Sequence, residues 1–442
     1  MTIEIAPRQL DLRVEPARSR IDQPLRLTVA GSAPGSPVTL SARTLDGAMV
    51  SWTSTATFTA DGQGTVDPAR DAPVEGTYAG VDGSGLWWSM RPEGARGHRF
   101  FSRRRPTPLS VTITASARGL PATSVTVERT FADPGVVEHL IDRPGLIGSL
   151  FRPPEPPPRP GVLILGGSDG GKLDHAAALL ASHGYAALSL AYFGVEDRPP
   201  QLLRIEIEYF ERALAWLAAR PEVDGDALAV VGLSRGGELA LLLASLLPQL
   251  KAVVAGSPSS VVQAGVAGYT DFTQPAWIRN GGPLPYLSGG RLGPGAFLRS
   301  LPSFLLRRPM RQRKTFERLL RDPERVRQAA IPVERIGGPV LLISGGDDQL
   351  WPSSRYCEQI VERLEAHHHP HPYRHLCYER AGHFLCFPYG LPSLPPMTRL
   401  NPPGAPITID FGGTAEANAA AARASWTEIL RFLGEAIGGN AS

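Results

Sequence analysis

Ser234 lies at the centre of VVGLSRGGELALLLAS, residues 230–245, where an apolar run, a Gly-x-Ser-x-Gly turn and a second apolar run follow one another. A strand that turns this sharply into a helix strains the serine backbone, and glycine two residues away on each side leaves room for the neighbouring backbone. Gly232 and Gly236 occupy those positions. The pattern predicts a nucleophile elbow that presents the serine hydroxyl to a substrate. A chance match in a glycine-rich chain is the competing interpretation.

A base and an acid for this serine follow later in the chain. A serine hydroxyl is a weak nucleophile at neutral pH, so it needs a base to take its proton and a carboxylate to orient that base. PVLLISGGDDQLWPS, residues 339–353, ends an apolar run in two acids, and YERAGHFLCFP, residues 378–388, presents His383 in a Gly-His turn. We select Asp348, the second acid, and assign Asp347 a structural role. Serine, acid and histidine in this order are typical of α/β hydrolases.

Attack on a carbonyl also requires hydrogen-bond donors for the oxyanion that forms. We expect one from the backbone N–H of Arg235, directly after the serine. The other should come from LILGGSDGGK, residues 163–172, with Ser168 as the first candidate and Asp169 as the next. A phosphate-binding loop is the competing interpretation of this segment, but it lacks the Gly-Lys-Ser/Thr ending of a nucleotide P-loop.

The segments around these residues alternate between strand and helix. Apolar strands are predicted at GVLILGG, YAALSLAYFG, LAVVG, AVVAGS and PVLLISGG, and helices at HAAALLASHG and IEIEYFERALAWLAARP. Such alternation predicts a mostly parallel sheet that helices cover on both faces, with the reactive groups at the carboxyl ends of the strands. We therefore predict an α/β-hydrolase domain over residues 136–442. Residues 258–330 interrupt its rhythm, and we interpret them as a cap or lid.

The first part of the chain has a different pattern. WTSTATFTAD, residues 52–61, places Trp52, Ala56 and Phe58 on one face of a strand and threonines on the other, and similar short runs recur between Gly, Pro and Asp. This pattern predicts an immunoglobulin-like β-sandwich over residues 1–135. RPPEPPPRPG, residues 152–161, is rich in proline, so we expect a stiff surface connection that joins neither a helix nor the interior of a sheet.

Composition excludes several classes of protein. The formal net charge is only +3, against 45 basic and 42 acidic residues, which argues against nucleic-acid binding. The chain contains no apolar run long enough to cross a membrane, and it begins without a secretory signal, so we expect a cytoplasmic protein. Its three cysteines are too few and too unevenly spaced for a disulfide framework or a closed zinc site. HHHPH, residues 367–371, is interpreted as a solvated loop, so no metal is expected.

Several segments taken together resemble the family of acyl-CoA thioesterases that also contains bile acid-CoA:amino acid N-acyltransferase (BAAT). In the first domain the resemblance rests on PGSPVTLSA, SWTSTATFTADGQGTVD and GTYAGVDGSGLWWSMRPEG. In the second it rests on YAALSLAYFGVEDRP, YFERALAWLAARPEVDG, GLSRGGELALLLAS and GGPVLLISGGDDQLWPS. The resemblance covers nearly the whole chain and implies the same two-domain architecture. It matches residues 258–330 least well.

The resemblance implies an acyl-CoA thioesterase with Ser234 as nucleophile, Asp348 as acid and His383 as base. Coenzyme A would then be part of the substrate, and no separate cofactor is expected. The thioesterases of this family resemble one another in using serine, whereas the amino-acid acyltransferase uses cysteine. The turn has Arg235 where relatives often have lysine, which we expect to matter little because only its backbone donor is used.

Other functions stay open at this point. One is an acyltransferase that moves an acyl group from a CoA or carrier-protein thioester to an amine or alcohol; another is a general carboxylesterase. A third is a binding protein that keeps the fold without catalysis. Two basic clusters are either phosphate-binding or solvated surface: Arg307, Arg308, Arg311, Arg313 and Lys314, and Arg103, Arg104 and Arg105.

Overall fold

The computed structural model describes residues 9–94, 99–102, 105–141, 143–154, 158–267, 271–291, 308–387, 395–400 and 407–438. The chain divides into two compact units, one reaching to Phe131 and the other beginning at Ala132. Arg103, Arg104 and Arg307 of the predicted basic clusters lie outside the described ranges. A search of the helices within these ranges finds none with the length and apolar character needed to span a membrane.

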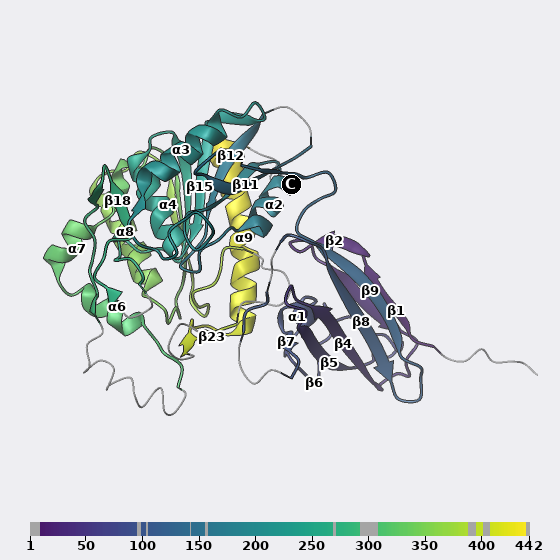
Figure 1. Cartoon of the computed structure of the whole chain (residues 1–442). Helices are drawn as coiled ribbons and strands as arrows, with labels where there is room; N and C mark the ends of the chain where they lie inside the picture. The colour runs from purple at the N-terminus through teal and green to yellow at the C-terminus, as the bar shows by residue number, and fades with distance from the viewer. Residues whose placement is uncertain are drawn as a thin grey trace, which may run out of the picture. The chain divides into compact units, whose positions relative to one another are not determined.

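The first unit is an immunoglobulin-like β-sandwich with two sheets (Figure 1). The smaller sheet pairs β1 (Asp11–Glu15) with β3 (Arg26–Ala30). The larger has the order β2 (Arg18–Arg20), β9 (Thr123–Thr130), β8 (Leu109–Ala117), β4 (Pro37–Leu45), β5 (Ser51–Thr59) and β6 (Glu75–Gly76), with β7 (Arg91–Pro92) also on β5; a short helix, α1, covers Gly85–Trp88.

Alternating burial explains why these segments form a sandwich. In β5, Trp52, Ala56 and Phe58 are buried, as their spacing predicts, while the threonines between them are half-buried or exposed. The same period-2 pattern holds in β1, β4 and β8. Each strand therefore contributes one apolar face to a shared interior.

The second unit contains an eight-stranded, mostly parallel sheet (Figure 1), which confirms the α/β-hydrolase prediction. Its order is β10 (Val137–Leu140), β11 (Ile147–Arg152), β13 (Ala186–Ala191), β12 (Arg159–Leu165), β15 (Val223–Leu233), β16 (Leu250–Gly256), β21 (Val340–Gly345) and β22 (Tyr373–Tyr378). All pairs from β13 to β22 are parallel, whereas β10 and β11 are antiparallel additions at one edge that the sequence analysis did not predict.

Helices cover both faces of this sheet. Leu163 and Leu165 of β12 belong to the same apolar core as residues of α3 and α4, and the intervening residue Ile164, which faces the other way, is equally buried. The principal helices are α2 (Asp174–Ser182), α3 (Ile207–Ala218), α4 (Arg235–Leu246), α8 (Ser353–Ala366) and α9 (Ala415–Ile437).

The proline-rich connection differs from its prediction at its carboxyl end. Arg159 and Pro160 are the first residues of β12 and pair with β15, so this part of the segment joins the sheet. The register shifts between Pro160 and Gly161. Proline is tolerated here because it lies at the start of the strand, beside the register shift, where the ladder can lose one N–H donor at little cost.

The predicted cap region contains small elements rather than one long helix. They are β17 (Asp271–Phe272), β18 (Trp277–Arg279), β19 (Gly282–Pro283), β20 (Gly290–Arg291), α6 (Arg313–Leu319), α7 (Pro323–Ala329) and a 3-10 turn at Val333–Arg335; β14 (Ile205–Glu206) pairs with β18, and β23 (Met397–Leu400) pairs with β24 (Ile407–Asp410). α6 begins at Arg313 of the basic cluster, and α7 is a separate helix because Asp322 caps it, accepting a hydrogen bond from the N–H of Arg325, and Pro323 begins it.

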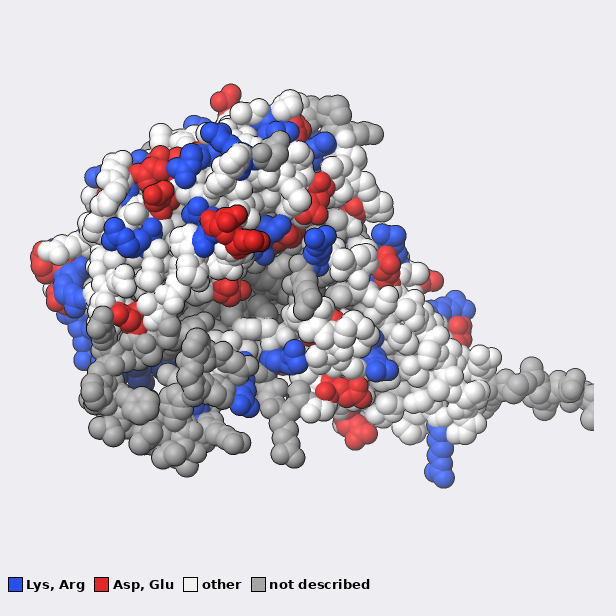
Figure 2. Space-filling view, viewed as in Figure 1, with Lys and Arg blue, Asp and Glu red and all other residues white. Residues whose placement is uncertain are grey.

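Charged side chains of both signs are interspersed on the face shown in Figure 2. This mixture fits the small net charge of the chain.

Candidate active site

The chain forms the predicted elbow between β15 and α4. Ser234 has a φ of 59° and a ψ of −121°, a strained conformation for a residue with a side chain. A Cβ on Gly232 would lie 2.0 Å from the carbonyl oxygen of Gly236, and one on Gly236 would lie 2.4 Å from the carbonyl oxygens of Leu165 and Gly166. Both glycines are therefore required by the close approach of backbone, as the sequence pattern predicts.

The topology brings the three predicted catalytic residues to one edge of the sheet. Ser234 directly follows β15, Asp348 lies in the turn after β21, and His383 lies in the turn after β22. These strands belong to the parallel run β15, β16, β21 and β22, so their carboxyl ends lie at the same edge. Active sites of open α/β sheets form at this edge.

Asp348 and His383 form a hydrogen-bonded pair in a fully buried position. His383 Nδ1 lies 2.8 Å from Asp348 Oδ2, and the hydroxyl of Ser353 donates to the same oxygen at 2.7 Å. The backbone N–H groups of Leu350 and Trp351 donate to Oδ1 at 2.9 and 3.2 Å. Four donors thus hold the carboxylate, and its contact with Nδ1 fixes the orientation of the imidazole.

Aromatic rings hold the other sides of His383. The ring of Trp351 meets it edge-on with centroids 5.7 Å apart, and the ring of Phe411 stacks against it at 6.2 Å. The Nε2 atom of His383 is buried and makes no hydrogen bond within the described part of the chain. This nitrogen is the one that a base of this type uses to take a proton from serine.

The backbones that carry Ser234 and His383 are fixed to consecutive residues at the end of β16. The N–H of Ser234 donates to the carbonyl oxygen of Gly256 at 2.8 Å. The hydroxyl of Ser257 donates to the carbonyl oxygen of His383 at 2.7 Å. These two hydrogen bonds tie the backbones of the serine and the histidine to the same end of β16.

The loop between β12 and α2 lies against the elbow. A Cβ on Gly167 would be 3.5 Å from the Cβ of Ser234, which places this glycine directly beside the serine. Ser168, the predicted source of the second oxyanion donor, is the next residue and is half-buried. Arg235 is the first residue of α4, where backbone N–H groups have no acceptor within the helix. The arrangement allows both backbone donors to serve an oxyanion.

The side chain of Arg235 has a role that the sequence analysis did not predict. It is buried and forms an ion pair with Glu238, Nη1 to Oε2 at 2.6 Å, and Nη2 donates to the carbonyl oxygen of Gln263 at 3.2 Å. The indole N–H of Trp277 donates to the other oxygen of Glu238 at 2.9 Å. The cluster joins α4 to two segments of the cap region, so an Arg-to-Lys difference changes buried contacts here, contrary to our expectation.

Replacing Arg235 by methionine is expected to destabilise the fold, and more so at high pH. Burial raises the pKa of Glu238 to about 7, and Arg235 opposes that rise. Without the arginine the native state keeps this proton to still higher pH, whereas the unfolded carboxyl loses it near its ordinary pKa of 4.5. Stability therefore continues to fall as pH rises above 7 in the variant but not in the wild type. We expect the free energy of unfolding of this variant to be about 3 to 5 kcal/mol lower than that of the wild type at pH 8.5.

Urea unfolding at pH 6 and pH 8.5 measures this difference. The matched control is Arg355→Met, because Arg355 pairs with Glu358 and Glu362 on the exposed surface of α8. Such pairs contribute less than about 1 kcal/mol, so this variant should resemble the wild type at both pH values. If Arg235→Met lowers the free energy of unfolding by the same amount at both pH values, the role given to Glu238 is contradicted.

Two further residues support the acid turn and were missed. Ser353 donates to Asp348, and Arg313 Nη1 donates to the carbonyl oxygens of Gly346 and Asp348 at 2.9 and 3.2 Å. Ser353 stands five positions after the acid and begins α8. A serine at a helix start usually caps the helix, so its residue type gives no sign of the bond to Asp348. Arg313 belongs to the basic cluster that we interpreted as either phosphate-binding or solvated surface, and its guanidinium instead donates to protein carbonyl oxygens. Arg311 of that run pairs with Asp410 at 2.8 Å.

The remaining sequence candidates lie away from the catalytic groups or serve the fold. Asp347 is exposed and accepts hydrogen bonds from Gln349 Nε2 and the N–H of Gly413. His369 of the histidine-rich loop is buried, with Nε2 3.2 Å from the carbonyl oxygen of Gly338. Among the described residues, no group of three His, Cys, Asp or Glu side chains could hold a metal ion.

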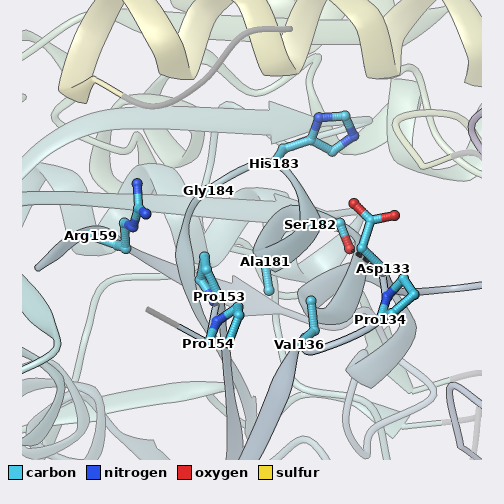
Figure 3. Close-up of a pocket in the computed structure, with 10 residues that line it drawn as sticks. All are labelled: Asp133, Pro134, Val136, Pro153, Pro154, Arg159, Ala181, Ser182, His183 and Gly184. Atoms are coloured by element: carbon cyan, nitrogen blue, oxygen red, sulfur yellow. Dashed lines mark hydrogen bonds between the residues drawn. The ribbon is translucent and has the colours of Figure 1, made fainter. Parts of the chain in front are cut away.

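A hollow of about 210 Å³ lies near the amino-terminal end of β12, away from the strand ends that carry Ser234 (Figure 3). Asp133, Arg159, Ser182 and His183 are among its lining residues, and the N–H of Asp133 donates to the hydroxyl of Ser182 at 2.8 Å. Arg159 begins β12, whereas the elbow loop follows the end of that strand. The hollow is therefore separate from the Ser234 site.

Comparisons with known proteins identify the family of this chain. The description "Acyl-CoA thioester hydrolase/BAAT N-terminal region" matches residues 22–142, and "BAAT / Acyl-CoA thioester hydrolase C terminal" matches residues 205–439. Acyl-coenzyme A thioesterase 1 of Rattus norvegicus is 33% identical over 97% of this chain and 97% of its own length. Peroxisomal succinyl-coenzyme A thioesterase of Mus musculus is 32% identical over 97% of each chain.

A solved structure, a puromycin-hydrolyzing peptidase of Mycobacterium tuberculosis, is 14% identical and aligns over 94% of this chain and 68% of its own, with a TM-score of 0.41. The family assignment does not depend on that likeness. It follows from the two matched regions, which cover most of both units, and from relatives above 30% identity over the full length. This chain belongs to the acyl-CoA thioester hydrolase/BAAT family.

Proposed function

We propose that the protein is an acyl-CoA thioesterase with Ser234 as its nucleophile. The observation that carries this proposal is the buried Asp348–His383 pair beside a strained elbow serine, in a chain that full-length thioesterases match. A carboxylate held by four donors orients the imidazole, and the elbow presents the hydroxyl to it.

Catalysis would proceed in two steps. Ser234 Oγ attacks the thioester carbonyl carbon while His383 Nε2 takes the hydroxyl proton, and the backbone N–H groups of Arg235 and Ser168 stabilise the oxyanion. The tetrahedral intermediate expels the coenzyme A sulfur, which receives that proton from His383, and leaves an oxygen ester on Ser234. His383 then takes a proton from water, which attacks the ester carbonyl carbon, and returns that proton to Ser234 Oγ as the free acid leaves.

The serine favours water as the acceptor. Its acyl-enzyme is an oxygen ester, whereas a cysteine nucleophile would keep a thioester, which amines attack more readily. Transfer to an amine or alcohol is therefore not the function we propose. The cytoplasmic location stays a prediction from the sequence, and the relatives named above include a peroxisomal enzyme.

Release of free thiol from short, long and branched acyl-CoAs tests the proposal. We expect release with at least part of this panel and equimolar free acid as the only acyl product, also when amino acids are added. Mass spectrometry of the products separates hydrolysis from transfer. Absence of thiol release across the panel would contradict the proposal, and an acylated amine as main product would replace it with acyl transfer.

A further inference from the structure

Asp169 is an acidic residue beside the reactive serine that the reaction scheme leaves without a task. Its Oδ1 lies 3.6 Å from the position that a Cβ on Gly167 would take, and the same position is 3.5 Å from the Cβ of Ser234. The carboxyl oxygen and the serine Cβ are therefore no farther apart than the sum of these two distances. The carbonyl carbon of an acyl group on Ser234 Oγ is two bonds from that Cβ.

The loop that carries Asp169 is held firmly. The hydroxyl of Tyr192 donates to the carbonyl oxygen of Gly166 at 2.6 Å before the acid, and the N–H of Gly171 donates to the carbonyl oxygen of Phe193 at 3.2 Å after it. A Cβ on Gly170 would lie 2.9 Å from the same Phe193 oxygen, so backbone packs closely there. The backbone that carries the carboxyl group beside the serine is thus held in place by these contacts.

No cation of the described residues pairs with this carboxyl group. Within those ranges, no lysine, arginine or histidine forms an ion pair with Asp169, and Lys172, the cation that follows it in the loop, binds Asp174 at 3.0 Å. The side chain is exposed. Desolvation raises the pKa of its carboxyl group, so the carboxylate forms at a higher pH than that of an ordinary aspartate.

A fixed, unpaired acid at this distance acts on charges carried by the substrate. A unit charge at such a range interacts strongly with a second charge where protein restricts the solvent. The thioester carbonyl itself is neutral, and the first charges near it are those on the acyl chain. Acyl groups that differ in charge two or three carbons from the carbonyl should therefore be distinguished here.

We propose that the Asp169 carboxylate sets the charge preference for the acyl group. It favours acyl groups with an ammonium or another hydrogen-bond donor on the second or third carbon from the thioester carbonyl. It disfavours acyl groups that carry a carboxylate there. This inference rests on the proposed thioesterase function and deepens it by naming a substrate class.

The test compares three acyl-CoAs of similar length. Butyryl-CoA is neutral, β-alanyl-CoA replaces its terminal methyl by an ammonium, and succinyl-CoA replaces it by a carboxylate. In Asp169→Asn we expect kcat/KM for β-alanyl-CoA relative to butyryl-CoA to fall about tenfold, and that for succinyl-CoA to rise about tenfold. Asp169→Ser, a second neutral variant, should give the same result, and Asp169→Glu should keep the wild-type order.

Asp174→Asn is the matched control, because it removes a carboxylate from the same stretch of chain that is already paired with Lys172. We expect it to leave both ratios unchanged. Unchanged ratios in both neutral variants of Asp169 would overturn the inference, and so would equal changes in Asp174→Asn.

A parallel series separates this inference from the proposed function. The p-nitrophenyl esters of butyric acid and β-alanine carry the same acyl groups without coenzyme A. If only the esters turn over and Asp169→Asn changes their ratio, the thioesterase function is wrong and the charge preference stands. If the CoA substrates turn over with ratios that the neutral variants do not change, the thioesterase stands and the charge preference is wrong. No hydrolysis in either series would overturn both.

Discussion

Replacing Ser234 by alanine should lower kcat for acyl-CoA hydrolysis by about 10⁴-fold or more. The change removes the only atom that forms a bond to the acyl group, while the strained turn and the oxyanion donors remain in place. We expect KM to change little, because the substrate contacts do not involve the hydroxyl before attack. Adding His383→Ala to this variant should cost little more, since a base without its nucleophile has no proton to take.

Ser245→Ala provides the matched control for this variant. Ser245 is a buried serine on the same helix, and its hydroxyl donates to the carbonyl oxygen of Leu242 at 2.7 Å. Its loss should leave kcat within about threefold of the wild type, since surface and helix changes away from the reacting atoms act on stability. Steady-state thiol release measures both variants. Comparable activity in Ser234→Ala and the wild type would remove the basis of the proposed mechanism.

Replacing Asp348 by asparagine should lower kcat by about 10⁴-fold. Each carboxylate oxygen accepts two hydrogen bonds, Oδ1 from the N–H groups of Leu350 and Trp351 and Oδ2 from Ser353 and His383. An amide NH₂ in either position faces two donors. Where the NH₂ replaces Oδ2, the histidine loses the acceptor that holds its Nδ1 proton, and Nε2 no longer faces the serine as a base.

Asp347→Asn is the control that distinguishes the two neighbouring acids. Asp347 is exposed, and its partners are Gln349 and the N–H of Gly413. We expect its kcat to stay within about threefold of the wild type, because it touches no reacting group. If kcat falls more in Asp347→Asn than in Asp348→Asn, then Asp348 is not the catalytic acid. Circular dichroism of both variants checks that each is folded.

Much of the fold could be predicted because local patterns and tertiary environment agree. In β5 the alternation of Trp52, Ala56 and Phe58 with threonines specifies which face is buried, and the structure buries it. Edge strands β10 and β11 were missed because VEHL and IGSLFR are short and carry weak alternation.

The catalytic residues could be located for a similar reason. Each lies at or shortly after the carboxyl end of a parallel strand, so the sheet topology alone brings Ser234, Asp348 and His383 to one edge. The support around them could not be predicted. Glu238 stands one turn after Arg235, a spacing that usually means a surface pair, and only Gln263 and Trp277, distant in sequence, bury it. Contacts of this kind depend on packing that a local pattern does not contain.

During hydrolysis the acyl group should pass through an oxygen ester on Ser234. Rapid-quench measurement of intact-protein mass after brief incubation with acyl-CoA, followed by peptide mapping, detects this ester. We expect one added acyl mass on the peptide that contains Ser234, formed together with free coenzyme A and absent from Ser234→Ala. An adduct on another residue, or the same adduct in Ser234→Ala, would contradict the account.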